Sequence, residues 1–252
     1  MIHRLWNNAG VQTTAVLGDI HGDYERMIGL VGHLPPDVHL VAVGDYFDRW
    51  DRAMEVVRWL MGRPNTTALL GNHDALILGV VAEAQRGQPG QSTDSWLYNG
   101  GKQEDLEKLM ADPEAVEWLK RRPAMTMLGS TLVQHSDSNV YLNYGRTLDE
   151  VNRAFGLRVA SGEPDVLFAV FAHLCRRRQF YKLDDLRRYL SVYGASTLIH
   201  GHTPHTQPAA LTMFNGAIIN VDGALSRGFG PERRGFLHWL PGGEEPDQTL
   251  VR

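Results

Sequence analysis

Five short apolar runs in this sequence each lead into an acidic, amide or imidazole side chain, and this pattern limits the fold more than any other feature. Each run has the length and composition of a buried strand. The runs lie over 13–18, 38–44, 67–71, 130–135 and 196–201. The side chains that follow them are Asp19 and His21, Asp45 and Asp48, Asn72 and His73, His135, and His202. Because the carboxyl ends of parallel strands meet at one edge of a sheet, we expect these side chains to converge.

Amphipathic stretches with helical spacing separate the apolar runs, and this alternation predicts an α/β fold with helices covering the sheets. The predicted helices lie over 23–34, 51–62, 74–86, 102–111, 113–122, 147–155 and 182–193. Further strands are expected over 216–223 and 235–242, and the Gly- and Ser-rich segment 85–96 is a candidate linker. We find no internal repeat, so we expect one domain over 1–252, with a core of about 13–240 and a frayed tail at 241–252.

Composition and charge exclude several classes of protein. With 43% hydrophobic and 21% charged residues, the chain of 252 residues has the composition of a soluble globular protein. Its net charge of -4 gives no reason to expect nucleic-acid binding, and its arginine clusters are interpreted as solvated faces or helix ends. The single cysteine, Cys175, excludes an intrachain disulfide and is expected to be a buried or idle thiol. Without an apolar leader or a run of about 18 apolar residues, we expect a cytoplasmic protein with no membrane partner.

The chemistry of the converging side chains points to metal ions. Each residue alone is explained by turn or helix-cap preferences, because Asn and Asp favour both positions. Together, carboxylate, imidazole and amide oxygen form the set of ligands that Zn²⁺, Mn²⁺ and Fe ions accept at about 2.0–2.2 Å. Five such clusters at the ends of successive strands are not accounted for by turn chemistry, so the sequence predicts a metal site.

The ordered motifs resemble one family of hydrolases. They are GDIHG (18–22), GDYFDR (44–49), GNHD (71–74), QHSD (134–137) and GHTP (201–204). This set resembles the calcineurin-like metallophosphoesterase superfamily, above all the phosphoprotein phosphatase branch with its small bacterial and bacteriophage lambda-type serine/threonine protein phosphatases. The stretches WLYNGG (96–101) and NVDGA (220–224) resemble the same members. The resemblance implies two mixed β-sheets packed as a sandwich and flanked by α-helices, which is the four-layer fold of this superfamily.

The resemblance also implies the ligands of two metal ions. One ion would be held by Asp19, His21 and Asp45, and the second by Asp45, Asn72, His135 and His202. Asp45 can bridge the ions because a carboxylate has two oxygens, and paired ions in such sites lie about 3.5–4 Å apart. The expected cofactors are two divalent or trivalent ions, with Mn²⁺ active in vitro and Fe or Zn as further candidates. A hydroxide shared by the two metals would attack phosphorus in line.

Three side chains beside the ligands are expected to act on the substrate. His73 is the predicted general acid, and Asp48 would accept its hydrogen bond and keep the imidazolium available. Arg49 offers a planar fork to two phosphate oxygens, and Asn72 would also face the substrate. A second phosphate-binding arginine is expected among Arg176, Arg177 and Arg178, with Arg177 as the working candidate.

Other positions near the motifs carry separate expectations. His200 is interpreted as a buried strand residue, and the role of His205 stays open. Pro204 replaces the second histidine of the GHxH form, which favours the phosphatase branch. Trp50 and Asp74 stand where that branch usually has Gly and Glu, and we expect Trp50 to narrow the cleft or to stack against an aromatic group.

The preferred function is hydrolysis of phosphomonoesters, with phosphoserine or phosphothreonine in proteins, and phosphotyrosine as a further case. The alternative is symmetrical hydrolysis of diadenosine tetraphosphate and other dinucleoside polyphosphates, because EWLKRRP (117–123) resembles a stretch of those bacterial hydrolases. Against it, those hydrolases usually replace the residue at Asp48. Nucleotide phosphodiesterase activity and a noncatalytic metal-binding scaffold are the minor alternatives. The sequence leaves the oligomeric state open.

Overall fold

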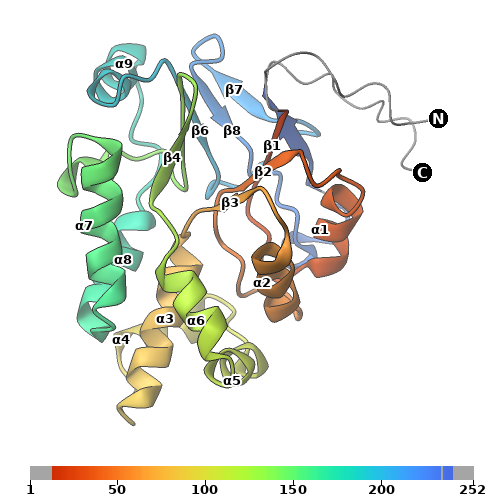
Figure 1. The fold of residues 1–252 in the computed structure, drawn as a ribbon, viewed down its shortest axis with the longest axis vertical. Helices are drawn as coiled ribbons and strands as arrows, with labels where there is room; N and C mark the ends of the chain where they lie inside the picture. The colour runs from red at the N-terminus through yellow and green to blue at the C-terminus, as the bar shows by residue number, and fades with distance from the viewer. Residues whose placement is uncertain (1–12, 234, 241–252) are drawn as a thin grey trace.

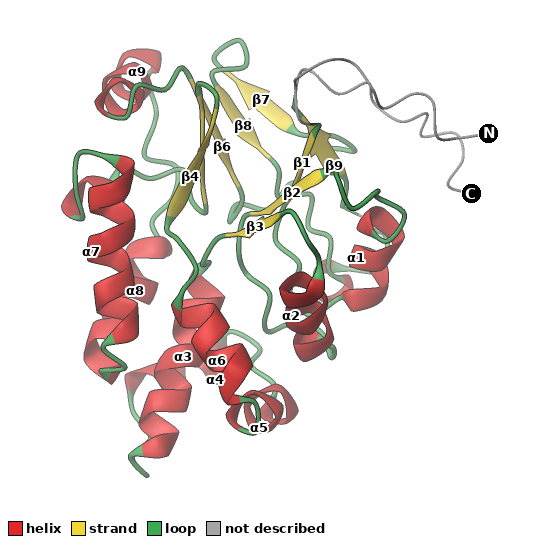
Figure 2. Cartoon of the chain, in the orientation of Figure 1, coloured by secondary structure: helices red, strands yellow, loops and turns green. Residues whose placement is uncertain are grey.

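Two mixed β-sheets lie side by side in the centre of the molecule (Figure 2). The computed structural model describes residues 13–233 and 235–240. The first sheet is formed by β1 (Thr14–Leu17), β2 (His39–Ala42), β3 (Thr66–Ala68) and β9 (Leu237–Trp239). Its strand order is β3-β2-β1-β9, in which β1, β2 and β3 are parallel and β9 is antiparallel to β1. The carboxyl ends of β1, β2 and β3 therefore lie at one edge.

The second sheet repeats this arrangement with a parallel centre. It is formed by β4 (Met125–Leu128), β5 (Thr131–Gln134), β6 (Thr197–His200), β7 (Leu211–Met213) and β8 (Ile218–Asn220). Its order is β4-β5-β6-β8-β7, with β5, β6 and β8 parallel and the two outer strands antiparallel to their neighbours. The second set of parallel strand ends can thus meet the first.

The helices cover the outer faces of the two sheets (Figure 1). They are α1 (Tyr24–Val31), α2 (Ala53–Gly62), α3 (Asn72–Gln85), α4 (Gln91–Tyr98), α5 (Gln103–Met110), α6 (Pro113–Lys120), α7 (Leu148–Ala160), α8 (Pro164–Leu174) and α9 (Leu183–Val192). In Figure 1, α1 and α2 lie on the side of the first sheet, whereas α7 and α9 lie on the side of the second. No helix in the described ranges is long and apolar enough to cross a membrane.

The period-two alternation of the strands divides the core into two parts. Successive strand side chains point to opposite faces, so neighbouring residues enter different layers. The layer between the sheets contains Val16, Val41, Val43, Leu69, Val133, Ile199 and Val221. Their strand neighbours, such as Leu17, Leu40 and Leu198, pack in the larger cluster against the helices. Both faces of each sheet are buried in this way, which confirms the expected sandwich flanked by helices.

Most predicted elements are present, and the differences have local causes. α8 was not predicted because its sequence, PDVLFAVFAHL, is apolar on nearly every side and lacks a helical stripe. The candidate linker 85–96 is wrong in its second half, where α4 begins at Gln91. The buried Glu83 carboxylate holds the start of α4 by accepting hydrogen bonds from the backbone N–H groups of Gly90, Ser92 and Thr93 at 2.8–2.9 Å. The predicted tail at 241–252 lies outside the described residues.

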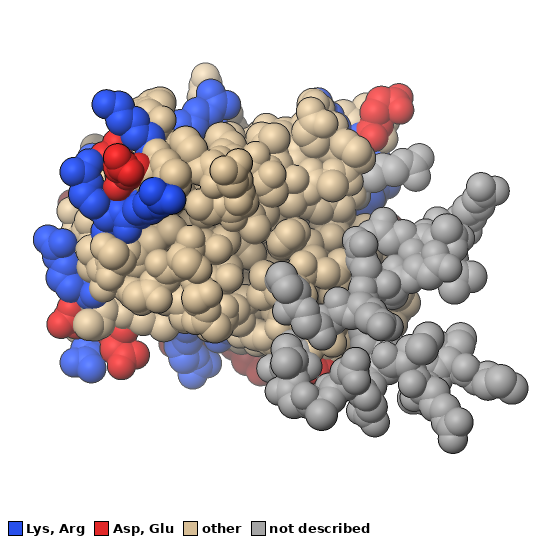
Figure 3. All heavy atoms as spheres, turned by 90° about the horizontal axis from the view of Figure 1, so that it is seen from above, with Lys and Arg blue, Asp and Glu red and all other residues tan. Residues whose placement is uncertain are grey.

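The paired arginines of α9 lie on a solvated face, as expected. Arg187 and Arg188 have side chains 69% and 77% exposed, and each pairs with an aspartate one turn earlier in the helix, Asp184 or Asp185. Figure 3 views the molecule from above, where charged side chains of both signs gather at the left, the side on which α9 lies in Figure 1. The basic charge of this cluster is therefore partly neutralised in place.

Candidate active site

The side chains that follow the strands meet in one small cavity, as the order of the motifs predicts. The cavity has a volume of about 170 Å³ and receives loops from both sheets. It is lined by Asp19, His21, Asp45, Arg49, Asn72, His73, Asn99, Cys175, Arg177, His202, Pro204, Asp222 and Phe229. His135 lies fully buried behind this surface, with Nε2 2.8 Å from Asn72 Oδ1. All the predicted metal ligands are therefore gathered around one centre.

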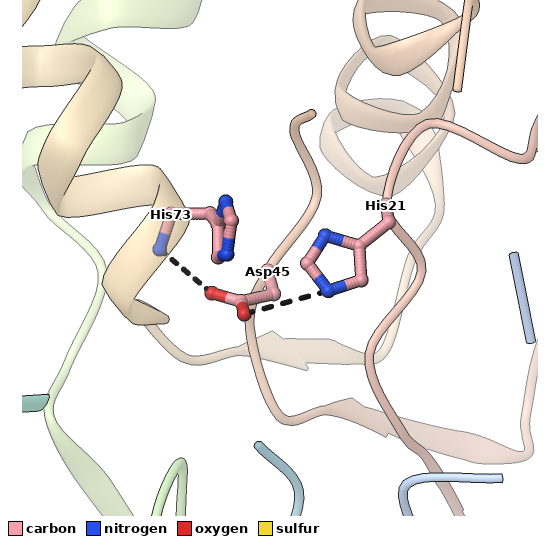
Figure 4. Close-up of side chains that lie close together, drawn as sticks. All are labelled: His21, Asp45 and His73. Carbon is pink, nitrogen blue, oxygen red and sulfur yellow. Dashed lines mark hydrogen bonds and ion pairs between the residues drawn. The ribbon is translucent and has the colours of Figure 1, made fainter. Parts of the chain in front are cut away.

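Asp45 lies at the middle of the cluster. Its Oδ2 is 3.7 Å from His21 Nε2, and its Oδ1 is 3.5 Å from His135 Nε2. Figure 4 shows the first of these contacts and the hydrogen bond from the backbone N–H of His73 to Asp45 Oδ1, which is 2.9 Å long. The two oxygens of Asp45 thus face different imidazoles, as a bridging carboxylate must.

Two groups of side chains within the described residues have the spacing of metal ligands, and they share Asp45. The groups are His21, Asp45 and His73, and Asp45, His135 and His202, with ligand atoms within 4.8 Å of one another. Asp19 lines the same cavity but stands outside both groups. Its two carboxylate oxygens accept hydrogen bonds of 3.0 and 3.1 Å from the backbone N–H of His202.

The backbone around Asp45 is built to hold this carboxylate in place. Asp74, in the first turn of α3, accepts hydrogen bonds from the N–H groups of Asp45, Tyr46 and Gly71 at 2.8–2.9 Å. A Cβ atom at Gly71 would lie 2.2 Å from Asp45 Oδ1, so only glycine permits this approach. The substitution of Glu by Asp at position 74 therefore has a structural role, which the motif comparison did not reveal.

Three imidazoles are fixed with one nitrogen free. In each ring the other nitrogen contacts a backbone carbonyl, which leaves a lone pair for a cation. The carbonyl partners, at 2.9–3.1 Å, are Phe47 for His21 Nδ1, Val43 for His135 Nδ1 and Cys175 for His202 Nε2. Burial lowers the pKa of all three rings, for His202 to about 3. Neutral imidazole is the form that binds metal.

The carboxylates of the cavity repel one another. Burial, Asp222 and Asp45 raise the pKa of Asp19 well above its ordinary value, and burial raises the pKa of Asp74 and of Asp222 to about 7. Burial opposes the charge of Asp45 too, but its imidazole neighbours, His135 first, hold the pKa of Asp45 below the usual range. Bound cations would offset this buried negative charge, so the donor set fits metal ions.

His73 and Asp48 form a buried pair beside the cluster. His73 Nδ1 lies 2.6 Å from Asp48 Oδ2, and the indole Nε1 of Trp96 donates a 2.7 Å hydrogen bond to Asp48 Oδ1. Burial alone would lower the pKa of His73, but the carboxylates of Asp45 and Asp48 raise it. The predicted contact between Asp48 and His73 is therefore present, and Trp96 is an additional partner that sequence reasoning missed.

Two arginines reach the cavity. The guanidinium of Arg49 lies 4.8 Å from the ring centre of Phe229, and its Nη2 is 3.5 Å from His73 Nε2. Of the three consecutive arginines after α8, Arg177 lines the cavity, whereas Arg176 and Arg178 are not among its lining residues. The geometry therefore favours Arg177 of the three.

The expected role of Trp50 is wrong. The guanidinium of Arg227 covers its ring at 4.5 Å, and the same guanidinium binds both oxygens of the buried Asp23 at 2.7 and 2.9 Å. Trp50 is held outside the cavity by this contact, and Phe229 is the aromatic side chain that lines it. Phe229 ends a 3₁₀ turn over Arg227–Phe229, for which the sequence offers no periodic signal.

The remaining single residues differ in outcome. His200 is 1% exposed on β6, which confirms the buried strand position, and His205 Nε2 contacts the Asn220 carbonyl at 3.2 Å. Cys175 is half-buried and lines the cavity, so its thiol is not remote from the site. Burial raises the pKa of this thiol to about 12, so it stays protonated and is no nucleophile.

Unusual backbone conformations collect at the site. Positive φ angles are uncommon for residues other than glycine, and they cluster where function fixes a side chain. In the motif loops, positive φ angles of 48–70° occur at His21, Asp45, Asp48, Arg49 and His202. The surrounding contacts hold each of these side chains in an orientation that a relaxed turn would not give.

Comparison with known proteins places this site in a family. The calcineurin-like phosphoesterase family matches residues 13–205, and the chain belongs to that family. The chain is 30% identical over 120 residues to a symmetrical bis(5'-nucleosyl)-tetraphosphatase of Klebsiella pneumoniae, a match that covers 45% of this chain and 38% of the relative. It thus spans about two fifths of the length of the curated relatives it matches.

Solved structures confirm the fold. The cold-active protein-tyrosine phosphatase of a psychrophilic Shewanella species superimposes with a TM-score of 0.69 at 20% identity, over 93% of this chain and 76% of that chain. A putative diadenosine tetraphosphatase gives a TM-score of 0.54 at 19% identity, over 94% of this chain and 93% of that chain. At these identities the likeness concerns the fold alone.

Proposed function

We propose that the protein is a phosphatase with two metal ions that hydrolyses phosphomonoesters, with phosphoserine and phosphothreonine in proteins as the substrate class. The observation that supports this most is the His73–Asp48 pair, placed beside a carboxylate that two ligand groups share. This arrangement combines a cation-binding centre with an acid for the leaving oxygen. Phosphoryl transfer requires both and little else from the side chains.

Each side chain then has a defined task. The ligands would be Asp19, His21, Asp45, Asn72, His135 and His202. When bound, the two cations would polarise the phosphoryl oxygens and acidify an attacking water. Arg49 and Arg177 would bind the remaining phosphoryl oxygens, with Asn72 beside them. His73 would donate the proton from Nε2 to the leaving oxygen, while Asp48 holds its Nδ1.

The size of the cavity favours a monoester with its leaving group outside. A volume of about 170 Å³ accommodates a phosphoryl group and the first atoms of its ester, but not a polyphosphate with two nucleosides. The exposed side chains of Leu97 and Tyr98, which precede the lining residue Asn99, offer a surface for the rest of a protein substrate. Such a shallow site is suited to a phosphorylated side chain on a larger molecule.

A direct comparison of substrates tests the proposal. Protein loaded with Mn²⁺ is assayed against p-nitrophenyl phosphate, a panel of phosphoserine, phosphothreonine and phosphotyrosine peptides, and diadenosine tetraphosphate. We expect the highest kcat/KM on phosphoserine and phosphothreonine peptides. Turnover of diadenosine tetraphosphate alone would replace the proposed substrate class, and no turnover on any substrate with metal confirmed bound would favour a noncatalytic scaffold.

The second candidate is symmetrical hydrolysis of dinucleoside tetraphosphates. It is supported by the curated relatives, which are 29–31% identical over 119–120 residues and carry that activity in their names. The phosphate and metal chemistry would be the same, and only the leaving group would differ. Identification of ADP as the sole product from diadenosine tetraphosphate would support this candidate, because symmetrical cleavage gives two equal halves.

A further inference from the structure

Asp222 is a buried carboxylate in the cavity to which neither the motifs nor the ligand groups give a role. It is 0% exposed, and it follows β8, the third parallel strand of the second sheet. The backbone of this segment lies against the end of β1, where a Cβ atom at Gly18 would be 2.2 Å from the Val221 carbonyl oxygen and 3.1 Å from Asp222 Cα. Glycine at position 18 therefore brings Asp222 beside Asp19.

One oxygen of Asp222 has a partner and the other has none. Oδ1 accepts a 3.0 Å hydrogen bond from the backbone N–H of Ala224, and the N–H of Asp222 donates a 2.8 Å bond to Asn220 Oδ1. These bonds fix the carboxylate in a tight turn. Oδ2 is buried without a hydrogen-bond partner, although the residue lines the cavity. An unpaired buried carboxylate oxygen is costly, so a structure keeps one only where something else binds it.

The charges around Asp222 indicate what that partner is. Its strongest electrostatic effect is on Asp19, and it also senses Asp45, Arg49 and Arg177. Within the described chain, neither arginine forms an ion pair with Asp222. The free oxygen therefore adds negative charge on the Asp19 side of the cluster and is not neutralised by a side chain. A cation is the ligand that this combination fits.

We infer that Asp222 is a further acidic side chain of the metal centre, whose Oδ2 stabilises the cation on the Asp19 and His21 side. This inference rests on the proposed metal-dependent function and extends its ligand environment to β8. Because Asp19 stands outside both compact ligand groups, the cation on its side has the less complete set of donors. Loss of the Asp222 charge should weaken that cation more than its partner.

The test measures metal binding directly. The variant Asp222→Asn keeps an oxygen that can accept from Ala224 and removes only the charge, and Asp222→Ser is a second variant with the same property. Metal-stripped protein is titrated with Mn²⁺, and free Mn²⁺ is followed by its electron paramagnetic resonance signal. Circular dichroism confirms that each variant is folded. Asp105→Asn is the matched control, because Asp105 is equally buried, on α5, and does not line the cavity.

We expect the wild-type protein and Asp105→Asn to bind two Mn²⁺ ions. In Asp222→Asn and Asp222→Ser, the affinity of one ion should fall by about 10- to 100-fold, and the other should change little. Two ions bound within twofold of the wild-type affinities in a folded Asp222 variant would overturn the inference and leave the proposed function intact. Failure of the wild-type protein to bind Mn²⁺, Fe²⁺ or Zn²⁺ would instead overturn the proposed function.

Discussion

His73 Nδ1 and Asp48 Oδ2 are joined by a hydrogen bond of 2.6 Å inside a pocket that excludes water from both groups. Because Nδ1 is occupied, Nε2 is the ring nitrogen that remains to exchange a proton with a substrate. The second oxygen of Asp48 is occupied by the indole of Trp96, so the carboxylate cannot turn away from the imidazole. The acid is therefore oriented by two partners before a substrate binds.

Replacement of the acid should affect substrates according to their leaving groups. We expect His73→Asn to keep both metals and to slow the hydrolysis of phosphoserine peptides by about 10²–10⁴-fold. The effect on p-nitrophenyl phosphate should be much smaller, because p-nitrophenolate leaves without protonation. Steady-state kinetics of both substrates on protein of measured metal content provide the test. Equal slowing of the two substrates would exclude His73 as the acid.

The indole of Trp96 should act through Asp48 alone. Trp96→Phe keeps a buried aromatic ring and removes the 2.7 Å hydrogen bond, so Asp48 loses one of its two anchors. We expect kcat for phosphoserine peptides to fall by about tenfold with KM unchanged, and p-nitrophenyl phosphate to be less affected. Trp118→Phe on α6 is the matched control, because Trp118 is not in the cavity lining. A rise in KM without loss of kcat would contradict this positioning role.

Asp45 should be needed for metal and for activity together. Its two oxygens face His21 and His135 at 3.7 and 3.5 Å, and both ligand groups contain it. In Asp45→Asn one oxygen becomes an amide nitrogen, which cannot bind a cation. We expect metal content, measured by elemental analysis after gel filtration, to fall below one ion per chain, with loss of turnover. Normal metal content with a normal rate would contradict the bridging role.

The sequence predicted the centre of the site better than its rim. The ligand residues follow strands, and strand ends are recognisable from apolar runs that stop at Asp19, Asp45 or Asn72. The second sheet was harder to anticipate, because five strand ends from two sheets converge where one crevice was expected. The side chains that position the ligands were missed for a related reason. Asp74 and Trp96 act through buried hydrogen bonds that join segments distant in the sequence.

The rim depends on packing that local patterns do not encode. Trp50 was expected in the cleft because it adjoins Arg49 in the chain. Its place is decided instead by Arg227, about 180 residues later, whose guanidinium covers the indole and binds Asp23. Phe229 reaches the cavity from the same turn. Neighbours in sequence therefore separated, and an aromatic residue without a recognisable motif took the expected position.

Asp105 should make the protein less stable as the pH rises. Its side chain is buried in α5, and neither carboxylate oxygen has a hydrogen-bond partner. Burial, followed by repulsion from Asp48, raises the pKa of Asp105 to about 7, so the folded protein holds this proton where the unfolded chain has released it. The free energy of unfolding therefore falls between about pH 4 and pH 7, by up to about 1.4 kcal/mol per pH unit.

Asp105→Asn removes this titration, so the stability advantage of the variant over the wild-type protein should increase from pH 5 to pH 7 and then level off. Urea denaturation at pH 5, 6, 7 and 8 measures the difference, and a constant offset between the two proteins reflects only the loss or gain of local contacts. Glu104→Gln, one residue earlier on the exposed side of α5, should show no such divergence. Parallel pH profiles for the wild-type protein and Asp105→Asn would mean that water or a neighbouring group reaches the carboxylate, and that its burial does not control its proton.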